Sequence, residues 1–301
     1  MILDNARSRS SQTCCHIASR LATLVLLAAL LTSCTEQRAI VVGSKNFTES
    51  VILGELLAQK LEAAGCKVDR RLNMGGTLVA DAAIQSGAID TYVEYSGTAL
   101  AAILKRPTMN DRAAVNAIVS SAYGSRGLRW SPPLGFDNTF AMIVRKADAE
   151  RDGLRTISDL ARVAGTIRPG FGYEFTERAD GWTGLQKAYG LRVEATPRSM
   201  DLGLMYKALT SDEVDLIAGA VTDGLIEPLG LVILADDRHY FPPYDAVVVR
   251  RPNLDERCKG AEAALESLRN TLDDATMRRL NHEVDGRKRD VAEVVRELLV
   301  P

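Results

Sequence analysis

Residues 39–66 form the stretch that most constrains how this chain can fold. Ile40, Val41 and Val42 predict a buried β-strand, and residues 43–46 form a short polar turn. Apolar side chains then recur at steps of three and four residues, which predicts an amphipathic helix with a buried face formed by Val51, Ile52, Leu56, Leu57 and Leu61. A strand, a turn and a helix in this order indicate the first unit of an α/β protein.

The turn between this strand and helix carries Lys45. Asn46 followed by Glu49 resembles a capping box, which places the start of the helix at this turn. Backbone N–H groups at a helix start are unpaired and favour negative charge, so the turn is a candidate site for an anionic group. An ordinary βα turn with a solvated lysine is the alternative, because most such turns bind nothing.

Strand and helix patterns alternate along the rest of the chain. Strands that alternate with helices of about ten residues predict mostly parallel sheets covered by helices. Pro132-Pro133 is expected to follow the end of a strand, and Gly170-Phe171-Gly172 to break one; residues 254–300 are expected to be helical throughout. The remaining predicted strands lie at 67–72, 88–95, 128–130, 138–145, 166–168, 192–195, 214–221, 231–235 and 244–249, and the helices at 77–86, 99–106, 111–123, 182–189 and 201–209.

The order of these elements predicts two α/β lobes. The chain leaves the first lobe near Asn138 and returns near Tyr244, so lobe I contains residues 34–139 and 245–301 and lobe II contains residues 140–244. Open parallel sheets bind ligands outside the carboxyl ends of their strands, so we expect a ligand cleft near the two crossovers.

The first 33 residues differ from the rest. Arginines precede an apolar run, residues 21–31, that is too short to span a bilayer and is typical of a signal peptide, which we assign to residues 1–33. The run ends in Leu31-Thr32-Ser33-Cys34, which resembles the lipobox of bacterial lipoproteins. We therefore expect Cys34 to carry a lipid that anchors the mature chain to a membrane.

Charge and composition exclude several classes of function. Loss of residues 1–33 removes three arginines and one aspartate, so the formal net charge changes from −2 to −4, which argues against nucleic-acid binding. The three histidines lack the spacing of metal ligands, and we expect no metal and no cofactor. Cys66 and Cys258 could form a disulfide outside the cytoplasm, but their spacing does not decide whether they do.

The predicted cleft combines aromatic rings, cations and hydroxyls, which suits a zwitterion. A quaternary ammonium cannot donate hydrogen bonds and is held by the faces of aromatic rings. A carboxylate needs the opposite chemistry: Arg178 can bind it through two N–H groups, and Lys45 and Thr98 can satisfy its other lone pairs.

Eight motifs occur in the order typical of one family and cover nearly the whole mature chain. The sequence resembles the substrate-binding lipoproteins of ABC importers for glycine betaine, carnitine, choline and related osmoprotectants. The motifs are GSKNFTES (43–50), MGGT (74–77), YVEYSGTAL (92–100), GFDNTFA (135–141), TISDLA (156–161), GWTGLQKAYGL (181–191), TDGLI (222–226) and FPPYDAV (241–247). The resemblance implies the type II periplasmic-binding-protein fold, in which two α/β lobes are joined by two crossover strands and close around the solute.

The resemblance also assigns site residues. It implies that the ligand carboxylate is bound by Lys45, Thr98 and Arg178, and that the ammonium lies in a cage formed by Tyr95, Phe140 and Tyr244. Asn138, Tyr173 and Ala220 are expected to line the cleft.

Two cage positions depart from the family pattern. Phe140 stands where the family usually has tyrosine, so the ring is kept and the hydroxyl is lost. Ala220 stands where the family has the tyrosine of YSTDG, so a fourth ring is absent unless another ring, such as that of Tyr173, replaces it. Alternatively, Ala220 makes room for a bulkier betaine, and the identity of the solute stays open.

These observations predict a solute receptor that is not an enzyme. It would sit outside the cytoplasm, bind a betaine-type solute and deliver it to an ABC permease. The alternatives are an extracytoplasmic enzyme or a ligand-sensing domain acting on a similar zwitterion. The enzyme has little support, because the chain contains no G-x-S-x-G motif and Ser44-Lys45 lacks the S-x-x-K spacing.

Overall fold

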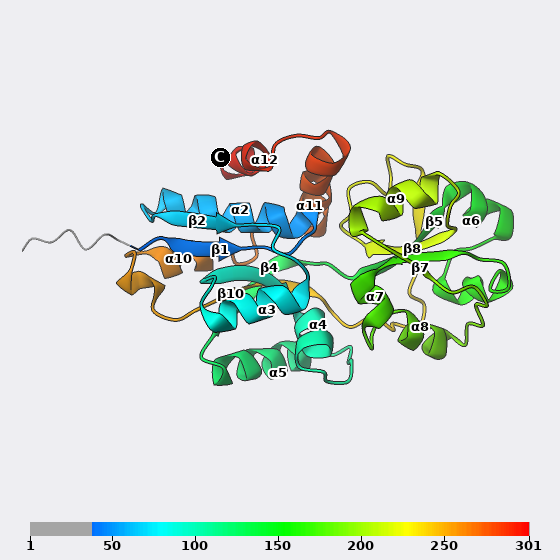
Figure 1. Ribbon diagram of the computed structural model, residues 1–301, viewed down its shortest axis with the longest axis horizontal. Helices are drawn as coiled ribbons and strands as arrows, with labels where there is room; N and C mark the ends of the chain where they lie inside the picture. The colour runs from blue at the N-terminus through cyan, green and yellow to red at the C-terminus, as the bar shows by residue number, and fades with distance from the viewer. Residues whose placement is uncertain (1–37, 301) are drawn as a thin grey trace, which may run out of the picture. The chain divides into compact units, whose positions relative to one another are not determined.

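The computed structural model describes residues 38–300, whose strands form two five-stranded sheets (Figure 1). The first sheet has the order β2-β1-β3-β10-β4. Strands β2, β1 and β3 are parallel, and β10 is antiparallel to both of its neighbours. The strands of this first sheet are β1 (Ile40–Gly43), β2 (Val68–Arg71), β3 (Thr91–Tyr95), β4 (Arg129–Asp137) and β10 (Asp245–Arg250).

The second sheet has the order β7-β6-β8-β5-β9. Strands β7, β6 and β8 are parallel, while β5 is antiparallel to β8 and β9. Its strands are β5 (Phe140–Arg145), β6 (Pro169–Gly172), β7 (Arg198–Met200), β8 (Leu216–Ala220) and β9 (Leu231–Leu234).

The chain crosses between the sheets twice, once between β4 and β5 and once between β9 and β10. This is the two-lobe α/β architecture that the sequence predicts. The sheets are mixed rather than mostly parallel, because the strand that follows each crossover, β5 or β10, runs antiparallel to its neighbours. The residue limits given above for the two lobes stay a prediction.

Helices cover both faces of the first sheet. On one face, α2 (Thr48–Ala63) packs against α10 (Ala261–Glu266), α11 (Asp274–Asn281) and α12 (Val291–Leu299). The opposite face packs against a separate apolar cluster that contains Tyr92 and Tyr123. The side chains of that cluster come largely from α3 (Thr77–Ser86), α5 (Arg112–Ser125) and η1 (Ala99–Ile103), the last of which follows the single turn α4 (Ser96–Thr98). Figure 1 shows α3, α4 and α5 on the side of the sheet opposite α2.

Helices also cover the second sheet. Helix α9 (Leu202–Thr210) packs on one face, where Tyr206 and Leu209 are buried with Ile143. The other face carries α6 (Lys146–Asp152), η2 (Ile157–Arg162), α7 (Tyr173–Glu177) and α8 (Trp182–Tyr189), which share the large apolar cluster that also contains α2.

Several predicted local features are wrong, for identifiable reasons. Helix α2 begins at Thr48 after Phe47, and no side chain caps it, so Asn46 and Glu49 form no capping box. Strand β4 continues through Pro132-Pro133 because it is an edge strand, where a missing N–H is tolerated. Residues 254–300 form five helical segments, including η3 (Leu254–Glu256) and η4 (His282–Gly286), rather than one continuous pattern.

Cys66 and Cys258 form a disulfide across 192 residues of sequence. Cys66 follows the end of α2 and Cys258 precedes α10, so the bond joins two segments whose helices already pack together. The sequence left this pairing open, because it depends on the distance between residues in the folded chain.

The predicted signal peptide and Cys34 lie outside the described residues. Within residues 38–300, no helix combines the length and apolar character that a membrane span requires.

Candidate functional site

Lys45 lies in the turn that links β1 to α2, and its side chain is buried with only 2% of the residue exposed. Its ammonium forms an ion pair with Glu94 of β3 and lies 3.4 Å from the hydroxyl oxygen of Thr77. The same ammonium is 5.1 Å from the centre of the Tyr95 ring. Lys45 is therefore a buried, paired cation rather than a solvated one, and its partner Glu94 is a carboxylate that the motif analysis did not assign.

Arg178 follows α7 in lobe II and is held by a carboxylate of its own lobe. Its Nε and Nη2 donate to Asp180 at 2.8 and 2.6 Å, and its Nη1 donates to Thr98 Oγ1 of lobe I at 3.1 Å. Burial works against the charge, but the Asp180 hydrogen bonds outweigh it and raise the pKa of Arg178 above its ordinary value. The guanidinium is thus fixed in place and fully charged.

A guanidinium has five N–H donors, and three of those on Arg178 bind Asp180 and Thr98. Within residues 38–300, the other two have no hydrogen-bond partner. Because the side chain is 7% exposed, these donors sit in a poorly solvated place and can receive a carboxylate.

Aromatic rings surround this guanidinium. Its central carbon lies 5.2 Å from the centre of the Phe140 ring and 5.8 Å from that of Tyr244. The two rings meet edge to face at 5.4 Å, and the Tyr244 hydroxyl donates to Asp180 at 2.5 Å. Phe175 and Phe241 complete this cluster around Phe140.

The residues predicted to form the ammonium cage and those predicted to bind the solute carboxylate are therefore mixed. They are not gathered at opposite ends of the site. Phe140 and Tyr244 lie with Arg178, while Tyr95 lies with Lys45 and packs against Phe47 at 6.0 Å. Among the described residues, no ring contact joins Tyr95 to Phe140 or Tyr244.

The three predicted lining residues lie in different environments. Ala220 ends β8 and pairs with Phe140 across the sheet, so its side chain neighbours a ring that we assigned to the cage. Tyr173 is 65% exposed and makes no ring contact with another described residue, so it does not stand in for a fourth ring here. Asn138 lies at the first crossover, where its amide donates to Glu49 at 2.8 Å and to Thr222 at 3.0 Å.

Glu49 is the centre of a buried network that motif reasoning did not find. One carboxylate oxygen accepts from the Tyr95 hydroxyl at 2.8 Å and from Asn138, and the other accepts from Thr222 at 2.6 Å and from Asn281 at 3.1 Å. These partners come from β3, the first crossover, the segment after β8 and the end of α11. Glu49 therefore ties lobe II, through Thr222, to lobe I and to a predicted cage residue.

Burial raises the pKa of Glu49 to about 7, although its hydrogen bonds favour the charged form; the nearby carboxylate of Asp223 adds to the increase. Between about pH 4.5 and pH 7 the folded protein therefore holds a proton that the unfolded chain has released. The stability contributed by this group is present below pH 4.5 and is lost as the pH rises through 7.

We predict that Glu49→Gln removes this part of the pH dependence. Since one pKa unit corresponds to about 1.4 kcal/mol, the unfolding free energy of the wild type should fall relative to that of the variant by up to about 3 kcal/mol between pH 4.5 and 7.5. Urea unfolding at a series of pH values measures this difference. Parallel profiles for the two proteins would show that Glu49 does not titrate in this range.

The carboxylates that the sequence analysis missed had a weak signal. Glu94 lies within a fully buried strand, TYVEY, where a charged residue needs a partner, and Asp180 follows Arg178 by two residues. Both facts point to pairing, but only the fold shows which cation each carboxylate binds.

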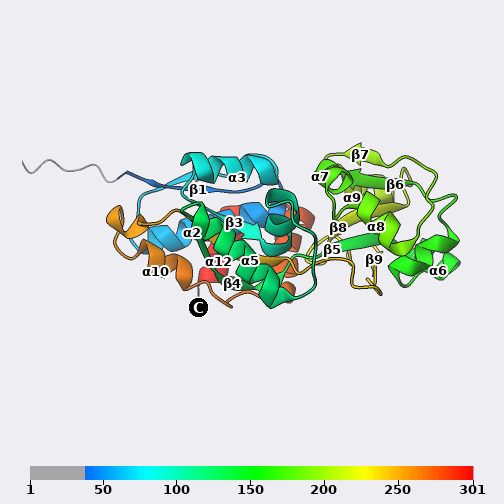
Figure 2. The same cartoon turned by 90° about the horizontal axis from the view of Figure 1, so that it is seen from below.

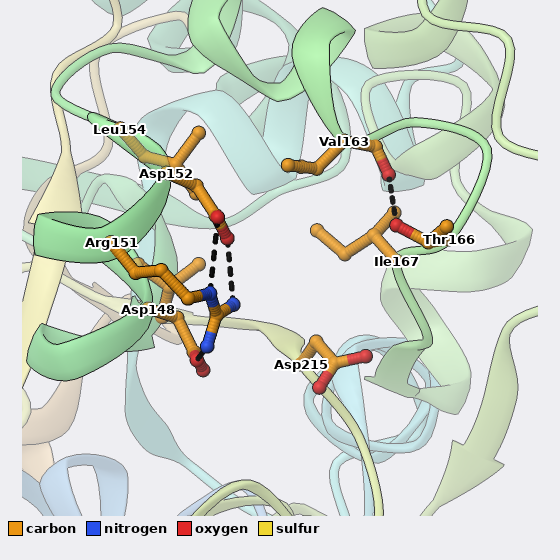
Figure 3. A pocket seen from close by; sticks show the side chains of 9 residues that line it. Asp148, Arg151, Asp152, Leu154, Val163, Thr166, Ile167 and Asp215 are labelled. Atoms are coloured by element: carbon orange, nitrogen blue, oxygen red, sulfur yellow. Dashed lines mark hydrogen bonds and ion pairs between the residues drawn. The ribbon is translucent and has the colours of Figure 1, made fainter.

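A pocket of about 110 Å³ lies elsewhere, in lobe II between β5, α6 and the segment before β6 (Figure 3). None of the predicted site residues lines it. Arg151 on the pocket wall is paired with Asp148 and Asp152 at 2.5 and 2.7 Å, so the positive charge of Arg151 is already neutralised. Residues 38–300 contain no cluster of side chains suited to hold a metal.

Known proteins are similar to this chain in fold and in sequence. Residues 38–300 match the family described as the substrate binding domain of the ABC-type glycine betaine transport system. A solved glycine betaine/carnitine/choline ABC transporter structure is 29% identical with a TM-score of 0.72, and the match covers 86% of this chain and 97% of that one. These findings define a substrate-binding protein of the ABC transporter class, with the two-lobe fold of that class.

Curated relatives of this chain have names that agree with this class of protein. A glycine-betaine-binding protein from Pseudomonas aeruginosa is 35% identical, with 86% of each chain covered. A carnitine transport binding protein from Listeria monocytogenes is 30% identical, with 86% of this chain and 85% of the relative covered. An ergothioneine transport permease/ergothioneine binding protein from Helicobacter pylori is 33% identical over 88% of this chain, which spans 48% of that relative. The chain belongs to the family of glycine betaine transport substrate-binding domains.

Proposed function

We propose that this protein binds a quaternary-ammonium zwitterion between its lobes and delivers it to an ABC permease. The observation that carries the proposal is the position of Arg178. It is held by Asp180, has two N–H groups without a partner among residues 38–300, and lies against the Phe140 and Tyr244 rings. Hydrogen-bond donors for a carboxylate and aromatic rings that can bind a cation thus meet at one place.

In this proposal, Arg178, Thr98 and Lys45 bind the solute carboxylate. The hydroxyl of Thr98 accepts from Arg178 and keeps its own hydrogen to donate. Lys45 is neutralised by Glu94, and Arg178 by Asp180, so the proposed site does not carry a large positive charge of its own. This balance suits a zwitterion better than a simple anion.

The trimethylammonium group would lie against the rings of Tyr95, Phe140 and Tyr244. In the described geometry these rings face Lys45 and Arg178. Each ring therefore has to offer the solute another part of its surface, or the Lys45 or Arg178 side chain beside it has to shift when the solute enters. Each ring contact with a desolvated ammonium contributes about 0.5–2 kcal/mol.

The relatives support the class of solute and leave its size open. Their names include glycine betaine and carnitine, and one relative is named for ergothioneine. Ala220 removes a ring from the cleft beside Phe140, which either weakens the binding of a small betaine or accommodates a bulkier one. The two solute sizes make opposite predictions for a substitution at position 220.

Ala220→Tyr should restore a ring beside Phe140. Affinity for a small betaine such as glycine betaine is expected to increase about two- to thirty-fold, through one added cation–π contact. A bulkier natural solute should lose affinity because the new side chain occupies its space. Calorimetric titration of both kinds of solute measures the two effects, and unchanged affinity for both would place position 220 away from the ammonium.

We further propose that the protein works outside the cytoplasm, tethered by a lipid on Cys34. The support is the apolar run that ends in Leu31-Thr32-Ser33-Cys34, together with a disulfide that requires an oxidising compartment. The mass of the mature N-terminal peptide tests this proposal, and an unmodified Cys34 would refute it.

A transport role without catalysis is the best supported mechanism, since the relatives are named as binding or transport proteins. A calorimetric screen with glycine betaine, proline betaine, carnitine, choline and larger trimethylammonium amino acids tests the function. Analysis of the same solutes after incubation tests the enzyme alternative, which requires a product.

A further inference from the structure

The helix α3, whose first residue is Thr77, begins without a cap of its own. The residue before it is Gly76, which has no side chain to accept a hydrogen bond, and its first turn contains no acidic residue. The first N–H groups of a helix need acceptors, and the positive end of the helix dipole favours a carboxylate there.

A carboxylate from the other lobe fills this position. Glu174 of α7 accepts from the Thr77 backbone N–H at 2.6 Å and from the Thr77 hydroxyl at 2.9 Å. A β-carbon on Gly76 would lie 2.2 Å from the Glu174 oxygen, so the glycine is what lets the carboxylate approach. Both helices can be followed in Figure 2.

The same short segment of lobe II makes a second contact with lobe I. Glu174 lies at the start of α7 and binds Thr77, while Arg178 directly follows α7 and binds Thr98. Thr77 is also within 3.4 Å of the Lys45 ammonium. The cap therefore adjoins the proposed carboxylate site, but Glu174 itself is exposed and binds the helix start rather than lining the ring cluster.

We propose that Glu174 is an interlobe latch that caps α3 only when the lobes are closed and thereby sets the affinity for every solute that closes them. The inference rests on the proposed function. When the lobes separate, Glu174 and the start of α3 both lose their partner to water. Closure gains a charge-assisted helix cap, and the solute is held correspondingly longer.

Glu174→Ala tests this proposal, with Glu177→Ala as the matched control. Glu177 lies in the same helix and is exposed, and it has no hydrogen bond or ion pair with another residue of the described chain. The loss of a helix cap should weaken binding about two- to thirty-fold, and the control should keep wild-type affinity. Because the latch acts on closure, glycine betaine and choline should lose affinity by the same factor, although choline has no carboxylate.

The outcomes separate the latch from the proposed function. Wild-type affinity of Glu174→Ala for both solutes overturns the latch. A loss confined to glycine betaine also overturns it, because Glu174 would then act by holding a cation of the carboxylate site, such as Arg178, rather than by closing the lobes. If the wild type binds neither solute, the proposed function fails, and hydrogen exchange of the Thr77 amide then tests the latch by itself. The contact between Glu174 and this amide is present without a solute, so the solute-free lobes close part of the time and protect the amide while they are closed. The amide should therefore exchange its hydrogen faster in Glu174→Ala than in the control, and equal rates overturn the latch.

Discussion

Replacing Arg178 by methionine should lower the free energy of unfolding by about 3–5 kcal/mol, because it leaves the carboxylate of Asp180 buried without its cation. The Asp180 side chain is fully buried, and Arg178 is its only salt-bridge partner within residues 38–300. Urea unfolding measures the loss. A variant as stable as the wild type would mean that this pair is hydrated in solution.

A second substitution separates the effect on folding from the effect on binding. Arg178→Met combined with Asp180→Asn removes both charges and keeps an oxygen for the Tyr244 hydroxyl, so most of the stability should return. Affinity for a zwitterion should stay at least about tenfold below that of the wild type, while choline should be affected much less. Equal losses for both ligands would remove Arg178 from the carboxylate site.

Loss of the disulfide should have an effect of similar size on stability. Cys66→Ala with Cys258→Ala opens a loop of 192 residues, for which the loss of chain constraint predicts a decrease of about 2–5 kcal/mol. The expected result is a lower urea midpoint for the double variant, matched by the wild type under reducing conditions. Identical midpoints in all three samples would show that the packing of α10 on α2 fixes these segments without the bond.

Elements with strong local signals are predicted well from this sequence. Helix α8 has the predicted limits, Trp182–Tyr189, because glycines flank it and Gly190 adopts the left-handed conformation that ends a helix. The same residue type misled the prediction at Gly170-Phe171-Gly172, which lies inside β6. A β-carbon on Gly170 would lie 2.8 Å from Val214, so this glycine permits close packing rather than a chain break.

The roles of the candidate site residues stay a proposal, but the sequence named several residues that the fold brings together. Lys45, Tyr95, Phe140 and Tyr244 each lie in a motif, whereas Arg178 lies outside the eight motifs. The acidic partners of these cations and rings could not be assigned, because Lys45–Glu94 joins residues 49 positions apart and the Glu49 contacts reach as far as Asn281. Glu49 was interpreted as a capping residue; the start of α2 instead turns its side chain inward, where four donors bind it.

Direct titration of the mature wild-type protein with a trimethylammonium zwitterion and its unmethylated counterpart, such as glycine betaine and glycine, tests the central claim. Rings hold a quaternary ammonium without hydrogen bonds, whereas a primary ammonium needs acceptors. The account predicts saturable binding, with one solute per protein, for at least one trimethylammonium zwitterion of the screen and much weaker binding of its unmethylated counterpart. Absence of binding for all the trimethylammonium solutes, or equal affinity for the methylated and unmethylated forms, would contradict it.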